Sequence, residues 1–389
     1  MRITAIHDQT IALQGAIANA VVDFSSHTVS LVAIVTDQFR NGRPITGVAF
    51  NSIGRFAQSG ILRERLIPRL LAADPDDLML NDGSGLDPAA VAAVAMTNEK
   101  PGGHGDRAGA VAALELAAWD LNAKLADEPA YATIARSQGL TALESAAPVY
   151  AAGGYYYGTD SLTRLRDELL AYADQGYRAF KIKIGGAPLA ADLARVETAI
   201  AVAGSPTAVA VDANGRFDLA GATEYGKVLA PLELRWFEEP ADPLDYALMG
   251  QLAESYAGAL ATGENLFSSI DALNLTRFGG LRAQQDILQM DPGLSYGLTE
   301  YLKTLDIVTH AGFTRSQCIP HGGHLLNLHI VIALGLGGCE AYPDVFQPFG
   351  GFSPACRIED GCVFPSDAPG FGLEQKPELA PHIKTLLEH

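Results

Sequence analysis

AFKIKIGG at residues 179–186 and AVAVDANG at residues 208–215 are the two runs from which we infer the architecture of the chain. Each is a short apolar stretch that ends in a charged residue, Lys183 in the first and Asp212 in the second. Short apolar runs followed by glycine are typical of buried β-strands. The residues between the two runs suffice for one helix, so the pair predicts a βαβ unit with parallel strands.

The same pattern recurs over the chain beyond Ala146. We expect strands, separated by helices, at Val149–Ala152, Ala179–Ile184, Ala208–Val211, Leu234–Glu238, Leu260–Gly263, Ile287–Met290, Gln317–Pro320 and Glu340–Tyr342. Eight such units form a (β/α) barrel of about 200 to 250 residues, and this span fits the lower end of that range. An open doubly wound sheet is the alternative. It usually carries a G-x-G-x-x-G turn between a strand and a helix, and the run Gly335–Gly338 has neither that spacing nor that position.

The first 130 residues have a different pattern. Short strands are expected at Arg2–Ile6 and Val29–Thr36, followed by a helix over Asp106–Leu125. Asp106 is a plausible N-cap of this helix, and Pro129 lies beyond its C-terminal end. Residues three and four apart predict one apolar stripe, formed by Val111, Leu114, Ala118, Leu121 and Leu125. Strands and helices grouped in this way indicate an α+β unit.

Composition limits the classes of protein to consider. The chain has 389 residues, is 48% hydrophobic and carries a formal net charge of −18, which disfavours nucleic-acid binding. Four cysteines without a C-x-x-C pair are expected to be small apolar side chains, not a zinc site or a disulfide framework. Asp8 and Gln9 interrupt the N-terminal apolar run, so we expect no signal peptide, no membrane span and a cytoplasmic protein.

Polar residues follow the predicted strands at a regular interval. Lys183, Asp212, Glu238, Glu264, Asp291 and His321 lie 29, 26, 26, 27 and 30 residues apart. In a (β/α) barrel the carboxyl ends of all strands meet at one mouth, where active sites lie. Asp212, Glu238 and Glu264 would then bring three carboxylates together, and oxygen ligands of this kind suit Mg²⁺. Singly, each could instead cap a turn or begin a helix, but their matched positions favour the metal site.

Lys181 and Lys183 lie two apart in one predicted strand and therefore share a face. If this face is the barrel interior, we expect repulsion and desolvation to lower at least one lysine pKa, as a general base requires. A solvent-facing edge strand is the alternative. At the other side, Asp291 could orient the ring of His321 and raise its pKa. Two proton-transfer groups flanking a metal would suit removal of a proton next to a carboxylate.

The motifs together resemble the mandelate racemase group of the enolase superfamily. They are KIK at Lys181–Lys183, VDANG at Val211–Gly215, WFEEP at Trp236–Pro240, TGEN at Thr262–Asn265, the pair Asp291 and His321, ALELAAWD at Ala113–Asp120 and APGFG at Ala368–Gly372. The resemblance implies a modified TIM barrel, (β/α)7β, with an α+β capping domain, bound Mg²⁺ and an enolate intermediate. The implied division is a capping domain at 1–130, the barrel at 131–365 and a C-terminal segment, 366–389, that returns to the capping domain.

Four further stretches resemble the D(−)-tartrate dehydratases within that group: TNEKPGGHGDR at Thr97–Arg107, YAAGGYYY at Tyr150–Tyr157, IPHGGH at Ile319–His324 and AYPDVFQPFGG at Ala341–Gly351. This resemblance implies Lys183 as the base and His321 as the acid. It also implies substrate contacts by Arg55, Lys100, Tyr155, Glu340 and Tyr342. The loops near residues 19–23 and 51–55 carry Val21, Val22 and Ile53, whose side chains offer no hydrogen bond to a substrate.

The sequence therefore predicts a dehydratase acting on an acid sugar, with D-tartrate converted to oxaloacetate as the specific expectation. Lys183 would remove the α-proton, Lys181 would stabilise the developing negative charge, and His321, oriented by Asp291, would protonate the leaving hydroxyl. The group also implies a homo-oligomer. Three alternatives remain open: a dehydratase for a longer sugar acid such as a hexonate, a racemase or epimerase of a 2-hydroxy acid, and a non-catalytic enolase-like binding protein.

Overall fold

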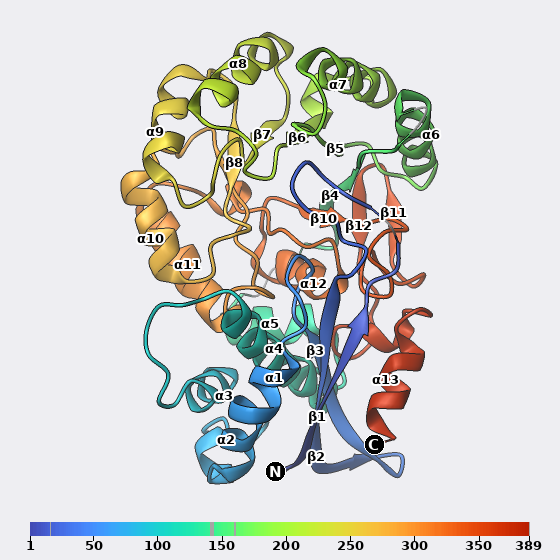
Figure 1. Ribbon diagram of the computed structural model, residues 1–389. Helices are drawn as coiled ribbons and strands as arrows, with labels where there is room; N and C mark the ends of the chain where they lie inside the picture. Colours follow the sequence, from blue (N-terminus) through green and yellow to red (C-terminus); the bar gives the residue numbers. More distant parts are fainter. Residues whose placement is uncertain (16, 141–143, 159–160, 389) are drawn as a thin grey trace.

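The computed structural model describes residues 1–15, 17–140, 144–158 and 161–388. Figure 1 shows a ring of strands and helices, green to orange, above a smaller part built from the N-terminal strands and helices. Within the described ranges, no helix combines the length and the apolar character that crossing a membrane would need.

The ring is a parallel sheet in which successive strands of the chain are neighbours. Its strands are β4 (Ala147–Gly153), β5 (Phe180–Lys183), β6 (Val209–Asp212), β7 (Trp236–Glu238), β8 (Leu260–Thr262), β9 (Ile287–Leu288) and β10 (Cys339–Ala341). The last of them, β10, pairs in parallel with the first, β4. The hairpin β11 (Arg357–Glu359) and β12 (Cys362–Phe364) adds to the start of β4 in antiparallel orientation.

The predicted strand at Gln317–Pro320 is reduced to a single parallel bridge between Leu288 and Cys318. The segment still follows β9, because the Ile319 amide donates to the Leu288 carbonyl at 2.9 Å. Two features shorten it: Arg315–Gln317 is a 3-10 turn, and Pro320 has no N–H to donate. The segment therefore occupies the seventh strand position of the barrel without forming a regular strand.

In the part of the barrel that the structure describes, seven helices separate the eight strand positions. They are α6 (Ser161–Asp174), α7 (Leu189–Ala203), α8 (Leu219–Leu229), α9 (Tyr246–Ser255), α10 (Ser269–Phe278), α11 (Leu298–His310) and α12 (Leu325–Leu334). The alternation gives the (β/α)7β barrel that the sequence predicts, because each helix returns the chain to the same end of the sheet.

The N-terminal part is a three-stranded antiparallel meander with helices packed on it. Its strands are β1 (Ile3–Ala12), β2 (Thr28–Arg40) and β3 (Arg43–Phe50), and its helices are α1 (Ser59–Ile61), α2 (Ile67–Ala72), α3 (Pro88–Ala95), α4 (Asp106–Ala126) and α5 (Ala130–Ser137). Helix α4 comes so close to β3 that a Cβ at Gly47 would lie 2.0 Å from the Ala117 carbonyl oxygen.

The prediction of one apolar stripe on α4 is wrong, because every residue from Arg107 to Ala123 is buried. The helix lies among β2, β3, α3, α5 and α11, so all of its faces are covered. Its N-cap is Gly105, not Asp106, which is the first helical residue. A carboxylate in the first turn is still favourable there, because it faces the positive end of the helix dipole.

The C-terminal segment lies against the N-terminal part. The Phe371 amide donates to Asp120 Oδ1 on α4 at 2.7 Å, and the Ala130 amide donates to the Gly370 carbonyl at the same distance. Helix α13 (Ala380–Leu387) packs against β1 and β2, as Figure 1 shows in red beside blue. These contacts support our proposal of a boundary at 365/366. The other proposed boundary, at 130/131, falls just inside α5, which packs both on α4 and on α12 of the barrel.

Candidate active site

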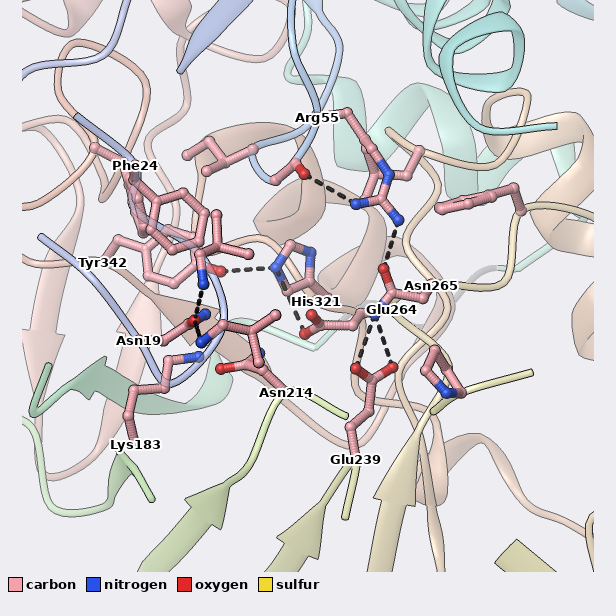
Figure 2. A pocket seen from close by; sticks show the side chains of 18 of the residues that line it. Asn19, Phe24, Arg55, Lys183, Asn214, Glu239, Glu264, Asn265, His321 and Tyr342 are labelled. Carbon is pink, nitrogen blue, oxygen red and sulfur yellow. Dashed lines mark hydrogen bonds and ion pairs between the residues drawn. The ribbon is translucent and has the colours of Figure 1, made fainter. Parts of the chain in front are cut away.

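A cavity of about 350 Å³ opens at the carboxyl ends of the barrel strands and is covered from the N-terminal side. Lys183, Glu264 and His321 line it from the barrel, and Asn19 and Arg55 line it from the loops that follow β1 and β3. Figure 2 shows these five side chains directed toward one space. The cavity therefore combines residues that are more than three hundred positions apart in the chain, from Asn19 to Phe346.

Three carboxylates form a cluster at this mouth. Lys183, Asp212 and Glu238 are register partners on β5, β6 and β7, and Glu264 follows β8 by two residues. One carboxylate oxygen from each of Asp212, Glu238 and Glu264 lies within 4.8 Å of the others, a group that could hold a metal ion. Burial, and then the negative charge of Asp212, raise the pKa of Glu238 to about 8. A cation at the cluster would relieve this repulsion.

The two lysines point inward, as one of the two predicted arrangements requires. Lys181 Nζ lies 2.6 Å from Glu238 Oε1 and 2.8 Å from Glu340 Oε1, and Lys183 Nζ lies 2.5 Å from Asp212 Oδ2. The expected lowering of a lysine pKa is wrong for this arrangement. Burial is the largest single effect and lowers the pKa of Lys183, but Asp212, together with Tyr155 and Glu264, outweighs it and raises the pKa overall. The prediction counted the two ammonium groups and left out the carboxylates beside them.

His321 lies at the other end of the carboxylate row. Its Nδ1 is 3.1 Å from Asp291 Oδ2, and its Nε2 is 2.9 Å from the Tyr342 hydroxyl and 3.8 Å from Glu264 Oε2. Burial lowers its pKa, but the charge of Glu264 and the hydrogen bond to Asp291 raise the pKa to about 9. Asp291 itself is fully buried and accepts hydrogen bonds from the Gly293 amide at 2.8 Å and the Asn327 side chain at 3.0 Å. The ring is thus held with Nε2 toward the cavity.

Four of the five predicted substrate contacts are at the cavity or support it. Arg55, Tyr155 and Tyr342 line it. Glu340 lies behind them: it accepts hydrogen bonds from the Tyr342 hydroxyl at 3.0 Å and the Gly322 amide at 2.9 Å. Glu340 therefore contacts Lys181 and Tyr342, not the cavity itself.

Lys100 is the exception and requires a correction. It is exposed in the loop between α3 and α4 and is not among the residues that line the cavity. The Arg107 guanidinium donates to the Lys100 carbonyl at 2.8 Å and to the Tyr296 hydroxyl at 3.1 Å, which holds this loop beside α4. A motif match assigned the residue, but the path of the backbone leaves its side chain in solvent.

The cavity also contains polar residues that the sequence analysis missed. Glu239, Asn265 and Asn214 all line it, and each directly follows, or lies within two residues of, a predicted metal ligand. Asn214 Nδ2 donates to Asp212 Oδ2 at 3.2 Å, and Asn265 Nδ2 donates to both oxygens of Glu239. Glu239 in WFEEP and Asn265 in TGEN each stand one residue after a predicted metal ligand. This shared position was the sequence signal that could have placed them at the cavity.

The wall opposite the carboxylates is largely apolar. Val21, Val22 and Ile53 line it, as do Phe24 and Phe346. Asn19 is the polar residue on this side: its Oδ1 accepts from the amides of Val21 at 2.8 Å and Val22 at 2.7 Å, so its NH₂ group is the part that could donate to a ligand. Hydrogen bonding to a ligand is therefore concentrated on the barrel side, at Arg55 and at the Asn19 NH₂ group.

Comparisons with known proteins agree with this geometry. The sequence profile of the family described as Enolase C-terminal domain-like matches residues 164–379. The arabinonate dehydratase of Saccharolobus solfataricus is 28% identical over 270 residues, which cover 67% of this chain and 68% of that protein. The L-talarate/galactarate dehydratase of Salmonella typhimurium is 25% identical over 344 residues, which cover 88% of this chain and 80% of that protein.

Solved structures support the same fold. The L-talarate dehydratase from Polaromonas sp. JS666, complexed with Mg and L-glucarate, superposes with a TM-score of 0.78 at 23% identity, over 98% of this chain and 96% of that one. A racemase from Streptomyces coelicolor A3(2) with bound magnesium gives a TM-score of 0.77 at 21% identity, over 98% of both chains. The barrel, the strand-end carboxylates and the family match together show that the chain belongs to the enolase superfamily, in the mandelate racemase/muconate lactonizing enzyme group.

Proposed function

We propose that the protein is a magnesium-dependent dehydratase of acid sugars and that its substrate is D-tartrate, which it converts into oxaloacetate and water. One observation carries this proposal: Lys183 and His321 stand at the two ends of the carboxylate row and line the same cavity. The names of the relatives, dehydratases of arabinonate and of talarate or galactarate, support the reaction class. The motifs shared with tartrate dehydratases support the shorter diacid as the substrate.

The residues at the cluster fit Mg²⁺. Asp212, Glu238 and Glu264 supply three hard oxygen donors from neighbouring strands, a set that leaves further positions for water or substrate oxygens. The ion, when bound, would offset the charge of Asp212 and the negative charge that develops on the substrate carboxylate. Lys181, between Glu238 and Glu340, adds a fixed positive charge at the same place.

The proton transfers follow from the positions of the two end groups. When the ion is bound, the Asp212 charge that raises the pKa of Lys183 would be offset. Lys183, as a neutral amine, would then remove the proton from the carbon next to the carboxylate. The His321 imidazolium, which Asp291 and Glu264 stabilise, then delivers a proton from Nε2 to the departing β-hydroxyl. Loss of water leaves an enol, which becomes the 2-keto acid. Arg55 and Tyr155 would contact the far part of the substrate, and Tyr342 would hold the His321 ring from the side.

The second candidate is a dehydratase of a longer sugar acid, which the names of the relatives favour. The apolar wall argues against it, because several hydroxyls of a six-carbon chain would face Val21, Val22 and Ile53 without partners.

The purified protein with Mg²⁺ should be incubated with a panel of mono- and diacid sugars that includes all three tartrate stereoisomers. We expect 2-keto acid only from D-tartrate, and its loss on addition of EDTA. Turnover of a pentonate or hexonate instead would support the proposed dehydration reaction but reject D-tartrate as the substrate. Exchange of the α-proton in D2O without any keto acid would identify a racemase or epimerase, and neither activity would favour the binding protein.

A further inference from the structure

Three polar residues in the cavity form a chain of hydrogen bonds that links the N-terminal part to the barrel. Arg55 follows β3, Asn265 follows β8 and Glu239 follows β7, and Figure 2 shows the dashed contacts that join them in this order. Arg55 Nη2 donates to Asn265 Oδ1 at 2.5 Å. Asn265 Nδ2 in turn donates to Glu239 Oε1 at 3.0 Å and to Oε2 at 2.8 Å.

Only one orientation of the Asn265 amide suits its neighbours. Arg55 carries only donors, so the carbonyl oxygen of Asn265 must face the guanidinium, and the NH₂ group then faces the two oxygens of Glu239. A flipped amide would place its NH₂ group against the donors of the guanidinium. Asn265 therefore links the two side chains, with a charge-assisted hydrogen bond, the strong type, at its Arg55 end.

Glu239 is the buried end of this series of hydrogen bonds. The residue is only 1% exposed, and the Asn265 amide donates to both of its carboxyl oxygens. A buried carboxylate without such donors is costly, so the contact is strongly favoured.

Arg55 is the other end of this series of hydrogen bonds and lines the cavity. Its Nη1 donates to the Gly54 carbonyl at 3.1 Å, and its Cζ lies 4.9 Å from the centroid of the Phe267 ring. These contacts engage one edge and one face of the guanidinium and leave other N–H groups toward the cavity. Apart from Lys183 and His321 at the metal end, Arg55 is the basic side chain among the described residues that line the cavity.

We propose that Asn265 and Glu239 are positioning residues for substrate recognition: through Asn265, Glu239 fixes the Arg55 guanidinium where the far carboxylate of a bound diacid would lie. The inference rests on the proposed function in one respect, namely that the substrate carries a second carboxylate. It assigns to two barrel residues a part in specificity that the cap residue Arg55 would otherwise have alone. Discrimination between diacids and monoacids would then depend on the contact between Arg55 of the N-terminal part and Asn265 of the barrel.

A double-mutant cycle tests this coupling. The ratio of kcat/KM for D-tartrate to that for the four-carbon monoacid with a hydroxymethyl group in place of the far carboxylate should be measured for four variants: wild type, Asn265→Leu, Arg55→Leu and the double variant. We expect Asn265→Leu to lower the ratio about tenfold, the scale of one charge-assisted hydrogen bond. The double variant should lose no more than Arg55→Leu alone, because Asn265 acts through Arg55.

Two further variants separate positioning from general damage. Asn274→Leu makes the same replacement at a half-buried position of α10, outside the cavity, and should leave the ratio unchanged. Glu239→Gln keeps the shape of the side chain but replaces one of the two oxygens that accept from Asn265 with an NH₂ group, so the ratio should fall, though by less than with Asn265→Leu. An unchanged ratio in Glu239→Gln would remove Glu239 from the proposal.

Additive losses in the double variant, with an active wild type, would overturn the inference and leave the proposed function intact. If the wild type turns over no acid, the proposed function fails. The same cycle is then measured as the Kd of D-tartrate by calorimetry in the presence of Mg²⁺. Coupled losses in Kd would support the inference, and additive losses or no binding by the wild type would overturn it.

Discussion

At the scale of single residues, the site depends on charges that compensate one another at short range. Lys183 pairs with Asp212, and His321 with Asp291, so each proton-transfer group is held by a buried carboxylate. The two residues nevertheless have different tasks in the proposed reaction. Lys183 breaks the C–H bond, and His321 acts only when the hydroxyl departs.

Separate substitutions should therefore separate the two steps. We expect Lys183→Ala to abolish both turnover and α-proton exchange of D-tartrate in D2O. His321→Asn should reduce keto-acid formation by about 10² to 10⁴-fold, the usual contribution of a general acid, and retain exchange. Proton NMR follows exchange and a coupled keto-acid assay follows turnover. Exchange that persists in Lys183→Ala would mean that another residue is the base.

At the scale of elements, no side chain of α11 itself caps its N-terminal end, and a residue of the N-terminal part does so instead. Its N-cap position is Gly297, without a side chain, and the buried Glu115 of α4 accepts hydrogen bonds from the amides of Leu298 and Thr299, both at 2.9 Å. Thr299 Oγ1 and Trp119 Nε1 donate to the same carboxylate. Gly297 is required there, because a Cβ would lie 2.3 Å from Glu115 Oε2. One carboxylate thus joins the two parts of the molecule.

Replacing Glu115 should cost stability. Glu115→Ala leaves buried donors without a partner, and we expect a loss of about 3 kcal/mol or more in the free energy of unfolding. Glu115→Gln retains one acceptor oxygen and should cost less. Urea unfolding followed by circular dichroism measures both. Equal stability of Glu115→Ala and wild type would contradict the capping role.

At the scale of the whole molecule, a titratable side chain, His329, is buried where α5, α12 and the C-terminal segment meet. Its burial makes the stability of the fold depend on pH. It is fully buried, accepts a hydrogen bond from the Tyr131 amide at 3.2 Å and lies against the Phe371 ring. Burial lowers its pKa from 6.5 to about 3. Between these two pH values, His329 is therefore protonated in the unfolded chain but neutral in the folded protein.

Stability should consequently fall on acidification through this range. The contribution of His329 is complete above pH 6.5 and is lost progressively as the pH falls toward 3, by up to about 1.4 kcal/mol per pH unit. His329→Gln keeps an acceptor for Tyr131 but does not titrate, so its free energy of unfolding should depend less steeply on pH. Urea unfolding of both proteins at pH 7.0, 6.0 and 5.0 checks this. Parallel curves would mean that His329 is protonated in the folded protein.

The sequence by itself determined the barrel and brought six ionisable residues to its mouth. One βα unit has a narrow range of lengths, so an interval of 26 to 30 residues between Lys183, Asp212, Glu238, Glu264, Asp291 and His321 was enough to bring them together. The motifs added the family, because local runs such as WFEEP are read without knowledge of the fold.

Only the tertiary structure decided the pKa values in the site and which residues of the N-terminal part line the cavity. The raised pKa of Lys183 depends on Asp212 and its neighbours, which approach through space from other strands. The exposed Lys100 and the chain from Arg55 to Glu239 depend on how loops of the N-terminal part lie over the barrel. Loops have no fixed period, and a pKa depends on every charge nearby, so local sequence contains neither result.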